Sequence, residues 1–275
     1  MKSVLTRHED GTIDLHITIP HTKIKETLEK SLQHMIKTAK IPGFRPGKAP
    51  KKVVEESINK SKLQEEVLKE LIPSAYIDAV KEHDLKPIIN PRVNVEKVEE
   101  GKDWEFVATT CELPKVTMGD YKKKVAAFTA KNKIAIPGKE QEKPSLDEII
   151  RIAVENATTT IPQILTDYEA DRLLSQTLDE IKRLGLSLDQ YLSSTGKTPE
   201  ELRKEYVEKA ARDMKVEFTI SQIAEDEKIT VDDKDITEAL AKAKNEGERK
   251  SLEANTYLLA SIIRQQKTLD FLQNL

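Results

Sequence analysis

The chain has 275 residues, a length that favours two domains over one. Charged residues make up 34% of it, and no apolar run reaches the roughly 18 residues that a membrane-spanning helix needs. A formal net charge of -3 excludes a globally basic nucleic-acid binder, and the single cysteine, Cys111, excludes an intrachain disulfide framework. The first ten residues become charged before an apolar segment forms, so we expect no signal peptide and a cytoplasmic location.

Residues 1–112 have the pattern of an α+β domain. Apolar and polar residues alternate from Ile13 to Ile19, which predicts a half-buried strand. Apolar residues at helical spacing follow from about Lys23 and again from about Val53. A further alternating stretch, residues 93–113, contains a polar turn and predicts a β-hairpin.

Residues 113–144 contain several prolines and glycines and a polar run, and we interpret them as an extended linker. The helical pattern of residues 145–275 predicts an all-α domain. Ser145 and Glu148 match a capping box at its first helix, and Thr198–Glu201 combines an N-cap, a proline and two acids at the start of a later helix. The expected fold class is therefore α+β and mainly helical.

The sequence offers no arrangement of residues typical of catalysis or of metal binding. The histidines all lie in the first half and none has the spacing of a zinc site; they are His8, His16, His21, His34 and His83. Neither GxSxG nor GxGxxG occurs, and we interpret the many single carboxylates as solvated helix faces. We therefore predict no catalytic residue, no metal and no cofactor.

The strongest electrostatic feature lies between residues 36 and 62. Only Glu55 and Glu56 oppose eight basic residues there, which gives a local charge of +6; the basic residues are Lys37, Lys40, Arg45, Lys48, Lys51, Lys52, Lys60 and Lys62. Within this region the segment IPGFRPGKAP contains three prolines and two glycines, which exclude a regular helix or strand. It predicts a rigid, basic tip between two helices.

This tip superficially resembles a phosphate-binding loop. A Walker A loop needs four residues between its glycines and a Ser or Thr after the lysine to hold the metal. Here only three residues separate Gly43 from Gly47, and Ala49 has no hydroxyl. We therefore reject a nucleotide site at this loop.

An exposed aromatic residue beside an arginine suits docking on a surface made of RNA and protein. Basic side chains contact phosphates, while Phe44 would stack on a base or enter a pocket beside Arg45. The alternative is a plain helix–helix connection in which Phe44 folds back into the core. The residues alone favour neither interpretation.

At this motif the sequence resembles trigger factor, a family of bacterial ribosome-associated chaperones. Residues 43–50 match the family's ribosome-docking signature, G-F-R-x-G-x-x-P. The segments LKPIINPRVNVEKVEEGKDWEF and GDYK resemble the end of the family's ribosome-binding domain, and LGLSLDQYLSSTGKTPEELRKE resembles its C-terminal helical domain. The resemblance extends over most of the chain.

The resemblance implies which residues would contact the ribosome. They are Gly43, Phe44, Arg45, Gly47 and Lys48, supported by a basic patch of Lys40, Lys51 and Lys52. Many members of the family have a lysine directly after the Phe-Arg pair, where this chain has Pro46. We expect the neighbouring lysines to supply that charge.

A second departure from the family concerns catalysis. Trigger factors normally contain an FKBP-type peptidyl-prolyl isomerase domain between the linker and the helical domain. Here the linker reaches the predicted helix at Ser145 almost directly, and no aromatic-rich strands form a proline pocket. We interpret the chain as a form that lacks the isomerase domain, and hence as a chaperone rather than an enzyme.

The function implied by the resemblance is that of an ATP-independent holdase. Residues 1–112 would form an α+β ribosome-binding domain, residues 113–144 would pack on the C-terminal domain, and residues 145–275 would form an elongated all-α domain with arm-like projections that binds clients. The implied partners are ribosomal protein and rRNA near the exit tunnel, nascent or unfolded polypeptides, and a second copy of the chain off the ribosome, with no membrane. Two alternatives remain open: an RNA-binding module that uses residues 36–62, and a peptidyl-prolyl isomerase like the full-length family.

Overall fold

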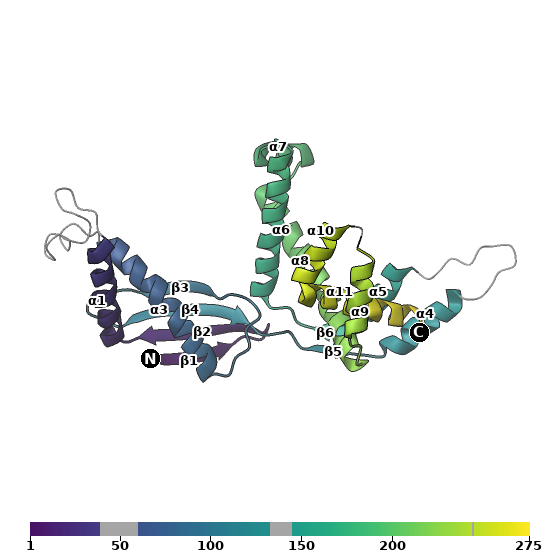
Figure 1. Ribbon diagram of the computed structural model, residues 1–275, viewed down its shortest axis with the longest axis horizontal. Coiled ribbons are helices and arrows are strands. Elements are labelled where there is room, and N and C mark those ends of the chain that lie inside the picture. The colour runs from purple at the N-terminus through teal and green to yellow at the C-terminus, as the bar shows by residue number, and fades with distance from the viewer. Residues whose placement is uncertain (39–59, 133–144, 244) are drawn as a thin grey trace. The chain divides into compact units, whose positions relative to one another are not determined.

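The chain forms two compact units, each with its own buried core (Figure 1). The computed structural model describes residues 1–38, 60–132, 145–243 and 245–275. The first unit contains residues 1–113 with the short segment 162–164, and the second contains residues 114–161 and 165–275.

The first unit is built on a four-stranded antiparallel sheet in the order β1-β2-β4-β3. Its strands are β1 (Lys2–Arg7), β2 (Thr12–Ile19), β3 (Arg92–Lys97) and β4 (Trp104–Cys111). The predicted strand is confirmed as β2, and the predicted hairpin as β3 paired with β4. The sequence did not reveal β1, because this edge strand is mostly exposed and carries no apolar alternation.

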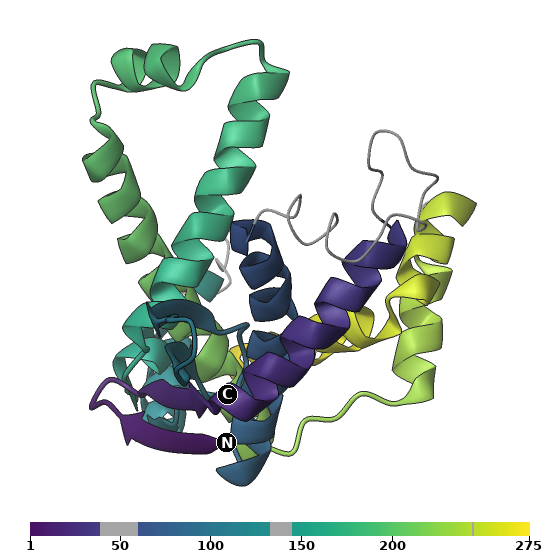
Figure 2. The same ribbon diagram turned by 90° about the vertical axis from the view of Figure 1, so that its left-hand side faces the viewer.

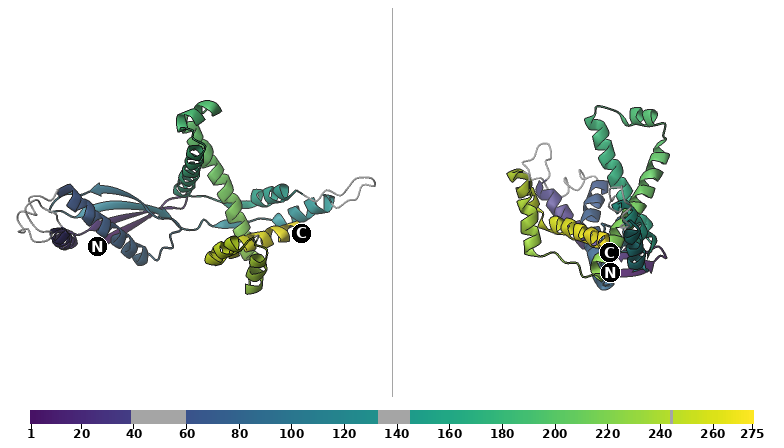
Figure 3. Two further views of the ribbon diagram at one scale, coloured as in Figure 1. Left: turned by 45° about the horizontal axis from the view of Figure 1, so that its top comes forward. Right: turned by 90° about the vertical axis from the view of Figure 1, so that its right-hand side faces the viewer.

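Helices α1 (His21–Thr38) and α3 (Lys60–Glu82) cover one face of this sheet (Figure 3, left). Every second residue of β2 from Ile13 to Ile19 points into the core and is at most 1% exposed. Trp104 and Phe106 of β4 extend the same apolar face. The helices add Ile24, Val67, Leu71, Ala75 and Ala79.

The sequence predicts that Pro73 either interrupts the second of these helices or starts a new one, and this prediction is wrong. A proline has no backbone N–H, so the hydrogen bond to the carbonyl of Lys69 is lost. Nevertheless α3 continues through Pro73. Leu71 and Ala75, on either side of it, are 3% and 1% exposed in the core. Tertiary packing of both halves therefore outweighs the local penalty.

The second unit is mainly helical, which confirms the expected fold class. Its helices are α4 (Tyr121–Asn132), α5 (Leu146–Glu155), α6 (Gln163–Arg183), α7 (Leu188–Thr195), α8 (Pro199–Asp226), α9 (Asp233–Ala241), α10 (Glu246–Ala254) and α11 (Thr256–Gln273). Two short strands, β5 (Val116–Met118) and β6 (Ala157–Thr159), pair antiparallel. Strand β6 is an addition to the all-α pattern expected after residue 145.

The expected extended conformation of residues 113–144 is wrong for residues 121–132, which form α4. Tyr121, Val125 and Phe128 recur at helical spacing and face the core of the second unit. Val125 is fully buried there. The many lysines between these positions obscured the apolar stripe in the sequence.

The two predicted helix starts differ in outcome. The start of α8 is confirmed, because the Thr198 hydroxyl accepts a hydrogen bond from Glu201 N at 3.2 Å and the Glu201 carboxylate accepts one from Thr198 N at 2.9 Å. The capping box at Ser145 is wrong: Ser145 is the N-cap of α5, but its side chain makes no capping hydrogen bond.

The sequence also predicts one last helix from about Arg249 to Phe271, whereas the structure has α10 and α11 separated at Asn255. The Asn255 side chain donates a hydrogen bond to Ser251 O at 3.2 Å, and its backbone leaves the helical region at φ -123° and ψ 49°. Asparagine competes for backbone partners in this way, which explains the break.

Candidate functional site

The predicted ribosome-binding residues lie outside the described residues. This applies to Gly43, Phe44, Arg45, Gly47 and Lys48, and to the basic residues Lys40, Lys51 and Lys52. The structure does describe the two helices that this segment joins, α1 and α3. Both are anchored in the core of the first unit, α1 through Ile24 and α3 through Val67 and Leu71. Both helices are therefore fixed in the core of the first unit.

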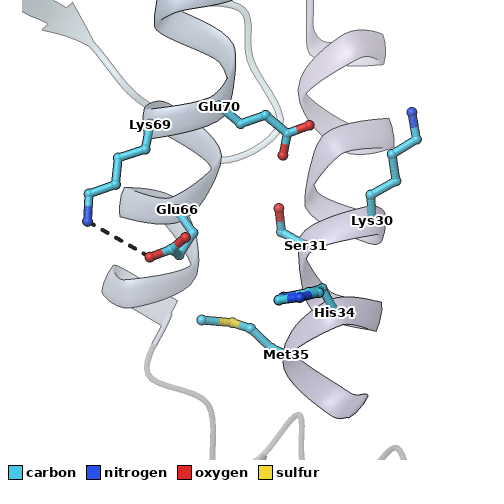
Figure 4. Close-up of a pocket in the computed structure, with 7 residues that line it drawn as sticks. All are labelled: Lys30, Ser31, His34, Met35, Glu66, Lys69 and Glu70. Atoms are coloured by element: carbon cyan, nitrogen blue, oxygen red, sulfur yellow. Dashed lines mark ion pairs between the residues drawn. The ribbon is translucent and has the colours of Figure 1, made fainter. Parts of the chain in front are cut away.

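A cleft of about 710 Å³ lies between α1 and α3 (Figure 4). Its lining side chains are Lys30, Ser31, His34 and Met35 from α1 and Glu66, Lys69 and Glu70 from α3. Lys69 Nζ lies 2.8 Å from the Glu65 carboxylate, and Lys30 Nζ lies 3.1 Å from Glu26. The hydrogen bond that Lys69 donates to the Glu65 carboxylate raises the pKa of Lys69. Because each lysine pairs with a carboxylate of its own helix, this cleft is not a basic phosphate site.

In the second unit α6, α7 and α8 form an arm, in which α6 and α8 diverge and α7 spans the tip (Figure 2). Gly185 ends the α6 segment with a φ of +75°. Leu186 N donates to Ile181 O at 3.1 Å and Gly185 N donates to Lys182 O at 3.0 Å, the pattern of a Schellman motif. Gly196 ends α7 in the same left-handed conformation, with a φ of +66°.

Two polar contacts hold α6 to α8 below this tip. The Thr177 and Tyr206 hydroxyls lie 2.6 Å apart, and Arg203 Nη1 donates to Asp171 Oδ1 at 2.6 Å. The Asp171 hydrogen bond raises the pKa of Arg203. These polar contacts add to the burial of Ile181 of α6, Leu192 of α7 and Leu202 of α8, which are 4%, 7% and 5% exposed.

Helices α9, α10 and α11 lie together at a separate place in the same unit (Figure 3, right). Lys267 of α11 forms an ion pair with Asp235 and donates to Thr230 O at 3.3 Å. Arg264 Nε donates to Ile229 O at 3.0 Å. The Lys267 contact lowers the pKa of Asp235. These bonds fix α11 against α9 and against the segment between α8 and α9.

A groove of about 440 Å³ runs between α8 and α11. Ile220 and Ala224 of α8 and Leu258 and Ile262 of α11 supply its apolar lining. Charged and polar residues share the walls; they are Asp213, Glu217, Ser221, Ser261, Arg264 and Gln265. A surface that alternates apolar and polar groups in this way can contact many polypeptide sequences without requiring one of them.

Exposed apolar side chains gather at two places in the second unit. The arm patch contains Leu184, Leu186 and Leu188, which are 76%, 44% and 37% exposed. The α11 patch contains Tyr257, Leu258 and Ile262, which are 91%, 59% and 52% exposed. Because these side chains are exposed, the protein lacks the favourable free energy that their burial in a core would provide. Clusters of this kind mark surfaces that bind other polypeptides.

The base of the unit contains a polar cluster around Glu227, at the end of α8. Its carboxylate accepts hydrogen bonds from Lys122 Nζ at 2.6 Å and from Tyr121 Oη at 3.0 Å. The Lys122 contact is the main reason that the pKa of Glu227 is lowered, and burial together with the neighbouring carboxylate raises the pKa of Tyr121. Since α4 and α8 are joined here, the cluster has a structural role.

The histidines form no site in the part of the chain that the structure describes. His8 Nε2 lies 2.7 Å from Asp14, and His83 Nε2 lies 2.9 Å from the Ser3 hydroxyl. Among the described residues, no three side chains of His, Cys, Asp or Glu come together as metal ligands. None of the described helices is long and apolar enough to cross a membrane.

Two family models match the chain. The model described as "Bacterial trigger factor protein (TF)" matches residues 1–143, and the model described as "Bacterial trigger factor protein (TF) C-terminus" matches residues 123–274. The chain belongs to the trigger factor family. The resemblance inferred from the sequence is therefore confirmed, and membership supports a chaperone role.

Individual trigger factors are similar to this family member at low identity. The protein of Staphylococcus epidermidis is 22% identical over 408 residues, covering 94% of each chain. That of Desulforudis audaxviator is 32% identical over 171 residues, covering 62% of this chain and 39% of its own. That of Staphylococcus aureus strain JH9 is 37% identical over 108 residues, covering 39% and 25%.

A solved structure has a similar fold. It is a trigger factor chaperone studied for promiscuous substrate recognition in folding and assembly, 16% identical to this chain, with a TM-score of 0.65. The match covers 100% of this chain and 99% of that one.

The sequence could not locate the arm patch or the α11 patch. Leucine and isoleucine at helical spacing are common to cores and to binding surfaces, so only burial separates them. One local signal existed at the arm, where Leu184, Leu186 and Leu188 alternate around Gly185 outside any helical repeat. No such signal marked Tyr257.

Proposed function

We propose that this trigger factor is an ATP-independent holdase that docks at the ribosome and shelters nascent polypeptides. Exposed apolar side chains in two separate patches of the helical unit carry the proposal. Each patch is small, so each contact with a client is weak and reversible. Binding at several such places, close to the emerging chain, would gain strength from high local concentration.

The proposal divides the chain into three parts. Residues 1–112 would bind the ribosome, residues 113–144 would connect, and residues 145–275 would bind clients. The protein would act in the cytoplasm and form a homodimer when it is off the ribosome, which sedimentation velocity would test. The direct test of the holdase is suppression of aggregation of a chemically denatured protein in the absence of ATP. Failure to suppress aggregation at a molar excess would contradict the proposal.

Docking is proposed to occur through the tip that contains Phe44 and Arg45. The support is the G-F-R-x-G-x-x-P signature, the local charge of +6, and the packed helices on both sides of the tip. The test is co-sedimentation with 70S ribosomes at physiological salt, comparing the wild type with the double variant F44A/R45A. We expect the wild type to pellet and the variant to stay in the supernatant.

A matched control removes an exposed aromatic residue and an arginine elsewhere. Tyr257 is 91% exposed, and Arg249 is paired with Glu253 on the surface of α10 at 2.9 Å. The variant Y257A/R249A should pellet like the wild type. Equal pelleting of F44A/R45A and the wild type would rule out the tip as the docking site.

The chain is further proposed to lack an isomerase domain. The alignment with the Staphylococcus epidermidis relative extends over 408 positions, whereas this chain has 275 residues, so well over one hundred positions of the alignment have no counterpart here. Refolding of a client limited by proline isomerisation should keep its uncatalysed rate in the presence of this protein. A rate that increases with chaperone concentration would establish isomerase activity instead.

The charge between residues 36 and 62 also supports a second candidate, an RNA-binding module. Such a module would bind naked RNA tightly, with a steep dependence on salt. Its binding would not change in the variant F44A. The ribosome-docking proposal predicts the reverse, with weak binding to naked RNA and a strong dependence on Phe44.

A further inference from the structure

The first unit contains a second cavity, of about 410 Å³, where the first turns of α1 and α3 meet the turn between β3 and β4. Its apolar lining consists of Ile24 and Leu28 from α1, Leu63 from α3 and Trp104 from β4. Small-molecule sites are typically apolar cavities of about 300–1,000 Å³ with a few polar groups at the edge. This cavity has both properties.

Specific contacts hold the walls of this cavity in place. Ile24 and Leu28 are four residues apart and share one face of α1, with His21 and Lys25 beside them. Asp103 Oδ1 accepts a hydrogen bond from His21 N at 2.8 Å, which ties the start of α1 to the hairpin. Trp104 is 3% exposed, and its Nε1 donates to Glu99 O at 3.2 Å. The lining is therefore preformed.

Three polar side chains that line the cavity have no hydrogen-bond or ion-pair partner among the described residues. They are His21, whose Nδ1 is buried, Lys25 of α1 and Gln64 of α3. Two carboxylates, those of Glu99 and Glu100, also lie at the edge, and Glu99 lies 2.5 Å from Lys102 Nζ. An ammonium and an amide next to an apolar cavity suit an anion with an apolar body.

We propose that this cavity binds a small apolar carboxylic acid, either aromatic or a medium-chain alkyl acid. The apolar part lies against Trp104 and Leu28, and the carboxylate accepts hydrogen bonds from the Lys25 ammonium and the Gln64 amide. The described residues of this site belong neither to the predicted tip nor to the helical unit, so the proposal does not depend on ribosome docking or on client binding.

The chain provides its own reporter for this site, because Trp104 is its single tryptophan. Titration of the full-length protein with octanoate should change the tryptophan fluorescence in a saturable way. Octanamide has the same apolar chain without the charge and should bind at least about tenfold more weakly, since a hydrogen bond to a charged group contributes more than a neutral one. An equal response to both probes, or no saturable response, would overturn the proposal.

Variants at the edge of the cavity test the contacts. The variant K25Q should weaken octanoate binding about tenfold and leave octanamide binding unchanged. The variant E100Q removes one negative charge from the edge of the cavity and should tighten octanoate binding. The control K30Q lies on the same helix outside this cavity and should bind octanoate like the wild type. All three positions are on the surface, so circular dichroism should show an unchanged fold. Loss of binding in K30Q equal to that in K25Q would contradict a specific site.

Discussion

At the scale of single residues, Glu227 joins α4 to the end of α8. The hydrogen bond from Lys122 is the main cause of a pKa below the usual value of 4.5, with burial opposing it and Tyr121 adding to it. Because the folded-state pKa is lowered, the ion pair stabilises the protein above about pH 4.5. That stabilisation is lost as the pH falls through the lower folded-state value.

We predict that the variant E227Q lowers the free energy of unfolding by about 1 kcal/mol at neutral pH. The difference from the wild type should shrink as the pH falls below 4.5, because the wild-type carboxylate is then protonated as well. Urea denaturation at several pH values across this range measures the difference in free energy of unfolding between the variant and the wild type. The control E208Q breaks an exposed pair with Arg212 at 4.0 Å and should have little effect. A difference for E227Q that does not vary with pH would contradict this account.

The neighbouring residue Lys228 has a φ of +54°, which is strained for a side chain with a Cβ. Ile229 N donates to Ala224 O at 2.8 Å and Lys228 N to Glu225 O at 3.1 Å, so Lys228 has the position where Schellman motifs usually have glycine. We predict that K228G raises the free energy of unfolding by about 0.5 kcal/mol, whereas K228A, which keeps a Cβ, does not. Equal effects of both variants on urea denaturation would attribute the change to the lost lysine side chain instead.

At the scale of elements, the two helix starts provide a matched pair. The Thr198 hydroxyl accepts a hydrogen bond from the first turn of α8, whereas the Ser145 hydroxyl makes no such bond at α5. We predict that T198A lowers the free energy of unfolding by about 1 kcal/mol, while S145A changes it by less than about 0.5 kcal/mol. Urea denaturation followed by circular dichroism measures both. If S145A lowers the free energy of unfolding as much as T198A does, the sequence pattern rather than the observed hydrogen bond determines how much each helix start stabilises the protein.

The elements also show how far local patterns determine this fold. The sequence predicts β2, the β3–β4 hairpin and the start of α8, because alternation and caps are encoded within a few residues. The sequence does not predict the elements whose conformation depends on packing against residues far away in the chain. Pro73 remains inside α3 because both flanking turns are buried, and α4 forms because Tyr121 and Val125 meet a core supplied by other helices.

The candidate sites also differ in whether local sequence patterns predict them. The docking tip is predicted from the sequence, since proline, glycine and charge spacing are local properties. The arm patch and the α11 patch consist of apolar side chains over which no other part of the unit packs. No local sequence pattern shows which side chains these are. Leu259 and Leu258 are neighbours on α11, yet they are 6% and 59% exposed. Their sequence contexts do not distinguish them.

At the scale of the whole molecule, the separate cores of the two units allow separate tasks. The first unit has its core between a sheet and two helices, and the second has its core where α4, α5, α8 and α11 meet. A substitution in one core need not disturb the surface of the other unit. Ribosome docking and client binding, as proposed, can therefore be removed one at a time by variants on different units.

The last prediction concerns how the two apolar patches act together. If one unfolded chain occupies both, the second contact forms at high local concentration, and affinity exceeds that of either patch alone by about 10²–10⁴. Replacing Leu184 and Leu186 by serine should then weaken a long client at least about tenfold, and so should replacing Leu258 and Ile262. A short peptide that fits one patch should respond to only one of these double variants.

Independent patches give a different result, because loss of one of two equal sites reduces the number of bound clients by about half and leaves the affinity of the other unchanged. Fluorescence anisotropy with a long and a short labelled client separates the two cases. The control I77S removes an apolar side chain that is 50% exposed on α3, in the other unit, and should leave both clients unaffected. A twofold or smaller loss for the long client in each double variant would show that the patches bind separately, and that a client is sheltered by several chaperone molecules rather than by one.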